Sequence, residues 1–299
     1  MIKSSNMSEL ESLAASQWGM FTTAQAQQLG VRRNQVSRMV DALRVEPMCY
    51  GVYRFTMGAE SVQADVKAAW LSVFPQRTAA ERLSERPLDA VLAGRTAAFA
   101  LGAGDFLASP YIFVVDRRRQ TSRGDVRFLR FALAEEDVVF VDGLPATSFE
   151  RTVYDLLRLD EDPALVDGFM QDAARTRGHL FDGDRMGILL GPIASRYGFG
   201  SGEEFAFDLI ARNASGIQIV RAAESLGHAL APLVERIEAL SSQNSSFYSD
   251  MTRALQNIAR IDAPRLDGAS ELAKVLATAV ATVEAQPKHE DSKKGERHG

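Results

Sequence analysis

The chain has 299 residues, of which 46% are hydrophobic and 24% charged, and its formal net charge is -5. This composition indicates a soluble globular protein with two or three domains and excludes a disordered chain. The acidic balance excludes uniform coating of nucleic acid, so any DNA contact must come from local basic patches.

The first 58 residues have the pattern of a winged helix-turn-helix domain, which we place at residues 7–58. Apolar residues at helical spacing predict a first helix that ends near Gly19. Thr22 or Thr23 can cap a second helix over 24–29, and Gly30 suits the following turn. A third helix follows over 33–43, with Val36, Met39, Val40 and Leu43 as its buried face, and then a β wing over 48–55.

Residues 32–54 carry a net charge of +3 in this acidic chain, which indicates that the third helix lies against DNA. Arginine, asparagine and glutamine can pair with base edges in the major groove. We therefore predict base contacts from Arg33, Asn34, Gln35 and Arg38, phosphate contacts from Thr22, Thr23, Arg32, Arg44 and Arg54, and further contacts from Ser37 and Tyr53. The blander alternative is a solvated helix face with incidental arginines.

Residues 60–215 predict an α+β domain with a small sheet. Helices are predicted over 66–73, 90–101, 148–159 and 163–176, and strands over 111–115, 126–131 and 138–141. Residues 117–130 carry a net charge of +5, and Gly124 and Asp125 suggest the tip of a hairpin between the first two strands. This second basic patch comprises Arg117, Arg118, Arg119, Arg123, Arg127 and Arg130. A solvated turn explains it equally well.

Residues 217–286 show apolar spacings of three and four, which predict a helical hairpin or bundle. A dimerisation or partner-docking element is the sharper alternative. Residues 287–299 are charged and poor in apolar side chains, so we predict a disordered tail. The fold class is thus α+β, with a winged helix, a middle α+β domain and a C-terminal helical region.

Motifs of catalysis and of cofactor binding are missing. The chain has one cysteine and four scattered histidines, and we found no phosphate-binding loop, nucleophile elbow or metalloprotease motif. We expect no catalysis, no cofactor and no metal site. No segment has the pattern of a signal peptide or a membrane span, so we expect a cytoplasmic protein with no membrane contact.

The order of several segments resembles the AbiEi family, the antitoxin and regulator components of type IV toxin–antitoxin systems. These segments are FTTAQAQQLGV, GVYRF, AGRTAAFALG, VVDRRRQ and, most specifically, VDGLPATSFERTVYDLLR at 141–158. The resemblance covers about residues 8–178. It departs at Arg32, where members often have serine, and at Glu46, Pro47 and Met48, where positive charge is usual.

The resemblance implies an autorepressor that binds inverted-repeat operator DNA, as a homodimer or cooperatively. It also implies a nucleotidyltransferase-fold toxin as functional partner, with no stable complex required, and a role in abortive infection. Two alternatives stay open on the residues alone. One is a ligand-responsive winged-helix transcription factor unrelated to a toxin, and the other is a winged helix that docks protein.

Overall fold

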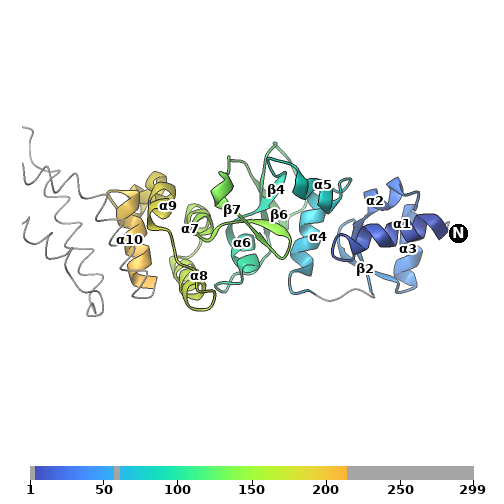
Figure 1. Ribbon diagram of the computed structural model, residues 1–299, viewed down its shortest axis with the longest axis horizontal. Helices are drawn as coiled ribbons and strands as arrows, with labels where there is room; N and C mark the ends of the chain where they lie inside the picture. The colour runs from blue at the N-terminus through green and yellow to red at the C-terminus, as the bar shows by residue number, and fades with distance from the viewer. Residues whose placement is uncertain (1–3, 57–60, 214–299) are drawn as a thin grey trace, which may run out of the picture. The chain divides into compact units, whose positions relative to one another are not determined.

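The computed structural model describes residues 4–56 and 61–213, and they fall into two compact units (Figure 1). The first unit extends to Leu180 and the second begins at Phe181. The helical region predicted at 217–286 and the tail predicted at 287–299 lie outside the described residues. The predicted boundary between the first two domains, near residue 59, also falls in a segment outside them.

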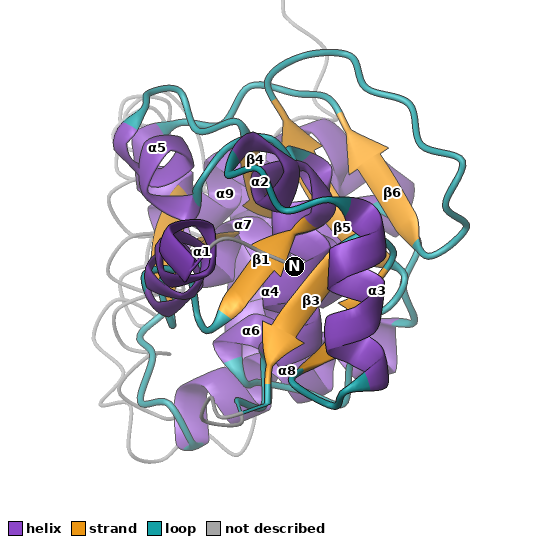
Figure 2. Ribbon diagram, turned by 90° about the vertical axis from the view of Figure 1, so that its right-hand side faces the viewer, coloured by secondary structure: helices purple, strands orange, loops and turns teal. Residues whose placement is uncertain are grey.

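The first unit begins with three helices and a three-stranded antiparallel sheet (Figure 2). The helices are α1 (Ser4–Ala15), α2 (Thr23–Gln28) and α3 (Arg33–Asp41). The strands are β1 (Met20–Thr22), β2 (Val45–Cys49) and β3 (Val52–Phe55), in the order β1-β3-β2. This arrangement confirms the winged helix-turn-helix, and β1 is a third strand that the sequence did not predict.

Local sequence signals explain these first elements. The hydroxyl of Thr22 accepts the N–H of Gln25, whose side chain accepts the N–H of Thr22, so a capping box starts α2. Gly30 has a φ of 75°, which the turn between α2 and α3 requires. Val36 and Met39 of α3 are buried. Leu43, predicted in that buried face, is 80% exposed, because α3 ends at Asp41 and Leu43 takes a left-handed conformation.

The middle of the first unit is a five-stranded mixed sheet in the order β6-β5-β4-β8-β7. Its strands are β4 (Ala90–Leu92), β5 (Tyr111–Val115), β6 (Val126–Leu129), β7 (Val138–Val141) and β8 (Leu144–Thr147). Its helices are α4 (Ala64–Val73), α5 (Ala79–Ser84), α6 (Gly94–Leu101), α7 (Phe149–Arg158) and α8 (Pro163–Arg175), with a short 3-10 turn at Glu135–Asp137. The small sheet of an α+β fold is therefore confirmed.

Two predictions in this part are wrong. The basic stretch is not a hairpin, because β5 and β6 pair in parallel and residues 116–125 form the crossover between them. The single helix predicted over 90–101 is a strand followed by a helix. Residues 90–92 lie in the centre of the sheet, where short apolar runs are buried on both faces, and Gly94 has a φ of 52° at the start of α6.

Within the first unit, the winged helix contacts α4 and the segment that follows it. The hydroxyl of Thr22 donates to the carbonyl of Pro75, and the amide of Gln25 donates to the carbonyl of Arg77 at 2.9 Å. Trp18 meets Trp70 edge to face, with their ring centroids 6.0 Å apart. These contacts fix the winged helix to α4 and α5, so the two parts share one core.

The second unit contains α9 (Gly183–Leu190), a 3-10 helix (Gly191–Tyr197) and α10 (Gly202–Asn213). The carboxylate of Asp182 caps α9 by accepting the N–H of Arg185 at 3.0 Å. Phe205 of α10 stacks between Tyr197 and Phe199, with ring centroids 5.1 and 4.5 Å away. These contacts place the three rings together in the described part of the unit.

Candidate nucleic-acid interface

The outer face of α3 is a row of exposed polar side chains. Arg33, Asn34, Ser37 and Arg38 are all exposed, on the side of the helix opposite Val36 and Met39. Arg33 and Arg38 form no ion pair in the part of the chain that the structure describes, whereas Arg54, Arg82 and Arg151 of the same unit do. Side chains of this kind can reach the edges of bases in a major groove.

The start of α3 is closed by Gln35 in place of a hydroxyl cap. Its side-chain carbonyl accepts the N–H of Arg32 at 2.7 Å, so the helix begins firmly at Arg33 although Arg32 cannot cap it. This contact occupies the acceptor of Gln35 and leaves its amide N–H groups for a ligand. Arg32 itself is exposed next to the first turn of α3.

Several of the predicted DNA-contact residues have side chains that are buried or bonded within the protein. Thr22 is fully buried, with its hydroxyl bonded to Gln25 and Pro75. Arg54 pairs with Glu46 at 2.7 Å, and only 12% of its side chain is exposed. Tyr53 is half-buried and stacks on Phe21 at a ring-centroid distance of 5.7 Å.

Two other predicted contact residues stay closer to the surface. Thr23 is half-buried near the carbonyl of Gly51, with its hydroxyl 3.4 Å away. Arg44 is half exposed and its guanidinium lies 3.4 Å from the carboxylate of Glu11. An exposed ion pair of this kind contributes little and can be exchanged for a phosphate.

The tip of the wing presents a residue that the sequence prediction did not include. Tyr50 is 79% exposed at the turn between β2 and β3, where Gly51 has a φ of 77°. An aromatic residue directly before a turn glycine in a wing was the available signal. Its ring is free to lie against sugar and phosphate groups.

The second basic patch lies beside this wing. Arg123 donates to the hydroxyl of Ser72 at 2.8 Å, contacts the sulfur of Cys49 at 3.8 Å and pairs with Asp125. The hydrogen bond with Asp125 raises the pKa of Arg123 and lowers that of Asp125, so this pair is a fixed anchor for the loop. Burial raises the pKa of the Cys49 thiol, which keeps it protonated at neutral pH.

The other arginines of the patch differ in how free they are. Arg117 pairs with Asp116 at 3.3 Å, and the guanidinium carbon of Arg119 lies 4.4 Å from the centroid of the Phe74 ring. Arg118, Arg127 and Arg130 are exposed and form no ion pair within the described residues. The patch therefore offers three unpaired cations next to a loop anchored to the wing.

The segment GLPATSFERT is structural. Ser148 caps α7 by accepting the N–H of Arg151, and Arg151 pairs with Asp137 at 3.1 Å and Asp155 at 3.2 Å. These side chains are buried and bond to one another, although one carboxylate oxygen of Asp155 has no hydrogen-bond partner among the described residues. Among the described residues, no group of three or more His, Cys, Asp or Glu could hold a metal ion. No helix in residues 4–56 and 61–213 is long and apolar enough to cross a membrane.

Comparison with known proteins identifies the N-terminal segment. Residues 8–56 match the family model described as a transcriptional regulator, AbiEi antitoxin, so this segment is similar to that family. A similar solved structure is the crystal structure of RV2827C protein from Mycobacterium tuberculosis, which is 15% identical with a TM-score of 0.43. The match covers 74% of this chain and 80% of that chain. No curated protein matches the chain.

Proposed function

We propose that the protein binds inverted-repeat operator DNA through α3 and represses its own operon, as the antitoxin of a type IV toxin–antitoxin system. The observation that carries this proposal is the outer face of α3, where Arg33 and Arg38 stay exposed without a carboxylate partner among the described residues. Elsewhere in the first unit most arginines are paired or stacked, so this face keeps its positive charge for a ligand.

In the proposed complex α3 lies in the major groove. Arg33, Asn34 and Arg38 read base edges, and the amide of Gln35 assists them, while Arg32, Ser37 and Arg44 contact phosphates. Thr23, at the start of α2, and Tyr50, at the tip of the wing, contact the sugar–phosphate backbone of the DNA. Thr22, Tyr53 and Arg54 are left out of the interface, because the protein itself occupies their side chains.

The basic patch extends this footprint along the DNA. Arg123 anchors the loop 116–125 to the wing, so Arg118 and Arg127 can contact phosphates beyond those that the wing reaches. These contacts carry no sequence information, and their role is affinity.

The antitoxin half of the proposal rests on the family match. In it the protein acts in the cytoplasm by binding rather than catalysis and counters a nucleotidyltransferase-fold toxin encoded nearby, as in abortive infection. Co-expression with the neighbouring gene tests it: growth arrest by that gene alone, relieved by this chain, is expected. Arrest that this chain fails to relieve would contradict the antitoxin role and leave the DNA-binding role standing.

The DNA-binding half is tested by gel-shift titration with the DNA upstream of the gene against random DNA of equal length. Arg33→Ala and Arg38→Ala should each cost about 1–3 kcal/mol of operator binding and reduce the preference over random DNA. Arg86→Ala is the matched control, since Arg86 is also exposed in the first unit but lies in neither basic surface. Stepwise shifts are expected, because two half-sites need two winged helices. Operator binding that survives both substitutions would contradict this interface.

A further inference from the structure

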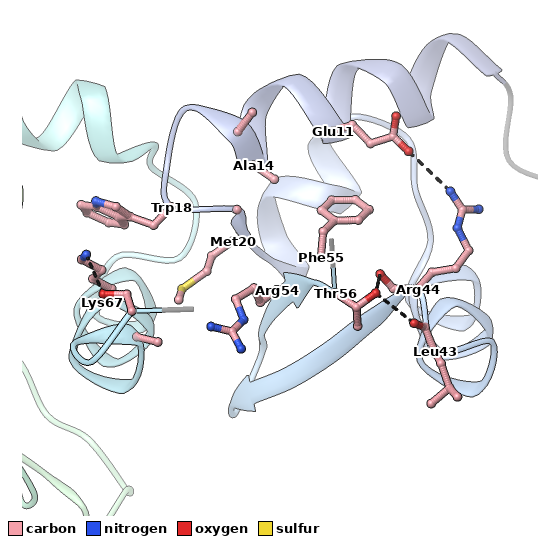
Figure 3. Close-up of a pocket in the computed structure, with 14 residues that line it drawn as sticks. Glu11, Ala14, Trp18, Met20, Leu43, Arg44, Arg54, Phe55, Thr56 and Lys67 are labelled. Atoms are coloured by element: carbon pink, nitrogen blue, oxygen red, sulfur yellow. Dashed lines mark hydrogen bonds and ion pairs between the residues drawn. The ribbon is translucent and has the colours of Figure 1, made fainter. Parts of the chain in front are cut away.

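The first unit contains a hollow of about 890 Å³ that is separate from the outer face of α3 (Figure 3). It opens between the end of α1, strand β3 and the start of α4. Its walls are mainly apolar, with Trp18, Met20 and Phe55 among the lining side chains. Sites for small molecules typically measure about 300–1,000 Å³ and have apolar walls with a few polar groups. The hollow therefore has the size and lining of a ligand site.

Lys67 of α4 lies in the wall of this hollow and is only 6% exposed. Its ammonium donates to the hydroxyl of Ser61 at 3.2 Å and lies 5.7 Å from the centroid of a Trp18 ring. It forms no ion pair with any residue that the structure describes. A hydroxyl and a ring face are neutral partners, so among the described residues the positive charge has no counter-charge.

The other cations of the hollow differ from Lys67 in this respect. Arg54 pairs with Glu46 at 2.7 Å, and Arg44 lies 3.4 Å from Glu11. Charged side chains are rarely buried unless they are paired, because the loss of hydration must be compensated. Within the described residues, Lys67 is therefore the cation of this hollow that has no carboxylate partner. An anionic group bound beside its ammonium would supply the counter-charge.

We propose that the hollow binds a small organic carboxylate with an aromatic or apolar body. The carboxylate accepts from the ammonium of Lys67, and the body packs against Trp18, Met20 and Phe55. An inorganic anion would leave these apolar walls uncovered, and a neutral apolar molecule would leave Lys67 uncompensated. The apolar walls fit the apolar body of such an acid, and the ammonium of Lys67 fits its carboxylate.

The test uses the full-length protein with 3-phenylpropionate and its amide, 3-phenylpropionamide, as probes. Isothermal titration calorimetry measures affinity, and quenching of tryptophan fluorescence reports contact with Trp18. The wild-type protein should bind the acid at least about tenfold more tightly than the amide, because a hydrogen bond to a charged group is worth more than one to a neutral group. Equal affinity for the two probes, or no saturable binding of the acid, would overturn the proposal.

Three variants locate the site. Lys67→Met keeps the aliphatic stem and removes the charge, so it should abolish the preference for the acid without lowering the unfolding midpoint. Ser61→Ala is the matched control, since it removes the hydroxyl partner but keeps the charge, and the preference should persist. Ala15→Phe places a bulky side chain at the exposed rim of the hollow and should weaken the binding of both probes. This variant still tests the site if Lys67→Met does not fold. An unchanged preference in Lys67→Met, or unchanged binding in Ala15→Phe, would show that the probe binds elsewhere.

Discussion

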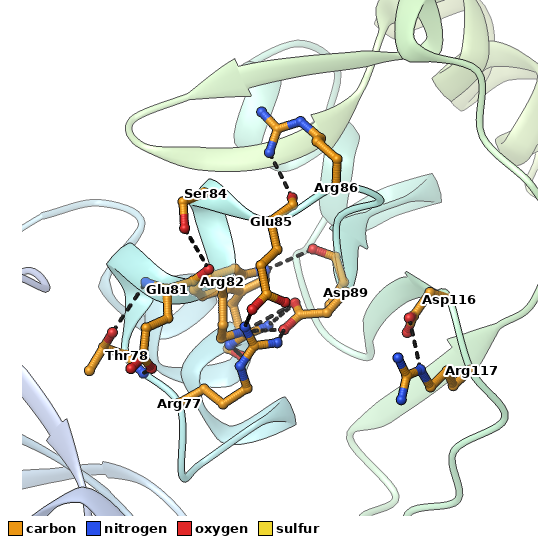
Figure 4. A network of polar contacts seen from close by, with 12 residues as sticks. Arg77, Thr78, Glu81, Arg82, Ser84, Glu85, Arg86, Asp89, Asp116 and Arg117 are labelled. Carbon is orange, nitrogen blue, oxygen red and sulfur yellow. Dashed lines mark hydrogen bonds and ion pairs between the residues drawn. The ribbon is translucent and has the colours of Figure 1, made fainter.

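At the scale of single residues, the arginines of the first unit divide into structural and free ones, and Arg82 is the clearest structural case (Figure 4). Arg82 is fully buried, and its guanidinium bonds both oxygens of Asp89, at 2.9 to 3.1 Å, and the carbonyl of Trp70 at 2.7 Å. Its guanidinium carbon lies 3.4 Å from the centroid of a Trp70 ring. Burial lowers the pKa of Arg82 to about 10, so the residue stays charged at neutral pH.

Arg82→Met should therefore destabilise the first unit strongly. The substitution leaves Asp89 buried with only Arg77, 3.3 Å away, so a loss of about 3–5 kcal/mol in the free energy of unfolding is expected. Urea unfolding followed by tryptophan fluorescence measures it, because both tryptophans of the chain lie in this unit. Asp89→Asn added to Arg82→Met should recover much of the loss. A single variant as stable as the wild type would contradict the structural role.

Asp155 gives a prediction of pH dependence. Burial raises its pKa from 3.8 to about 6, against the opposing effect of Arg151, and one of its oxygens has no hydrogen-bond partner in the described structure. The folded state thus holds the proton more tightly than the unfolded state. Protonated Asp155 makes its full contribution to the free energy of unfolding below about pH 3.8. This contribution is lost as the pH rises through about 6. The loss is on the order of 3 kcal/mol.

Asp155→Asn removes this loss because the amide does not ionise, while Arg151 keeps Asp137 as its partner. The variant should be more stable than the wild type above about pH 6, and its advantage should shrink as the pH falls toward about 4. Urea unfolding at a series of pH values measures the difference. Asp65→Asn is the control, since Asp65 is exposed on α4. An advantage that does not change with pH would contradict the assigned cause.

At the scale of elements, the sequence predicted helices better than strand connections. The apolar spacing of α3, α4, α7 and α8 placed each helix within a few residues of its observed bounds, because one buried face gives a repeating signal. The parallel pairing of β5 and β6 was missed, since a short apolar run does not encode its partner or direction. The strand β4 was interpreted as helix for the same reason, because it is an apolar run of only three residues that begins with alanine.

In the candidate interface, too, helical spacing predicted the exposed face, whereas contacts between elements were not predicted. The exposed face of α3 follows from its helical period, so Arg33, Asn34, Ser37 and Arg38 lie where predicted. The burial of Thr22 and the pairing of Arg54 with Glu46 depend on contacts with other elements, which spacing does not show. Lys67 and its hollow depend on packing between α1, β3 and α4, and no motif marks them.

The packing of α9 against α10 depends on one glycine of the second unit. A Cβ atom built on Gly202 would lie 2.0 Å from the carbonyl oxygen of Gly187 and 2.5 Å from the backbone nitrogen of Gly191. Backbone atoms cannot rotate away, so Gly202→Ala must separate the helices, at a cost above the usual range of about 1–3 kcal/mol for overpacking.

Hydrogen exchange of the α9 and α10 amides measures this effect. Protection should fall in Gly202→Ala and persist in Gly191→Ala, because a Cβ on Gly191 meets nothing within 4 Å. Operator binding should stay unchanged in both variants, since the proposed interface lies in the first unit. Full protection in Gly202→Ala would show that the helices tolerate a wider separation.

At the scale of the whole molecule, charge is distributed unevenly. The chain is acidic overall, at -5, yet residues 32–54 carry +3 and residues 117–130 carry +5. Arg123 joins these two basic segments by contacting Cys49 of the wing from the crossover loop. A negative molecule with a local basic surface is repelled from DNA in most orientations and attracted in one, which favours docking through that surface.

The salt dependence of binding separates the roles proposed for the two segments. Neutralised phosphates release counterions, so the slope of log K against log salt should become shallower by about 0.9 for each phosphate that the protein no longer neutralises. Arg118→Ala combined with Arg127→Ala should weaken binding to operator and random DNA alike. The double variant should also reduce the steepness of the salt slope by about 0.9 for each of the two arginines that binds a phosphate. Arg38→Ala should instead weaken operator binding more than random binding, because it removes a hydrogen bond to a base edge. Titrations at several salt concentrations on both DNAs measure the slopes, and an unchanged slope in the double variant would mean that the crossover loop faces away from the DNA.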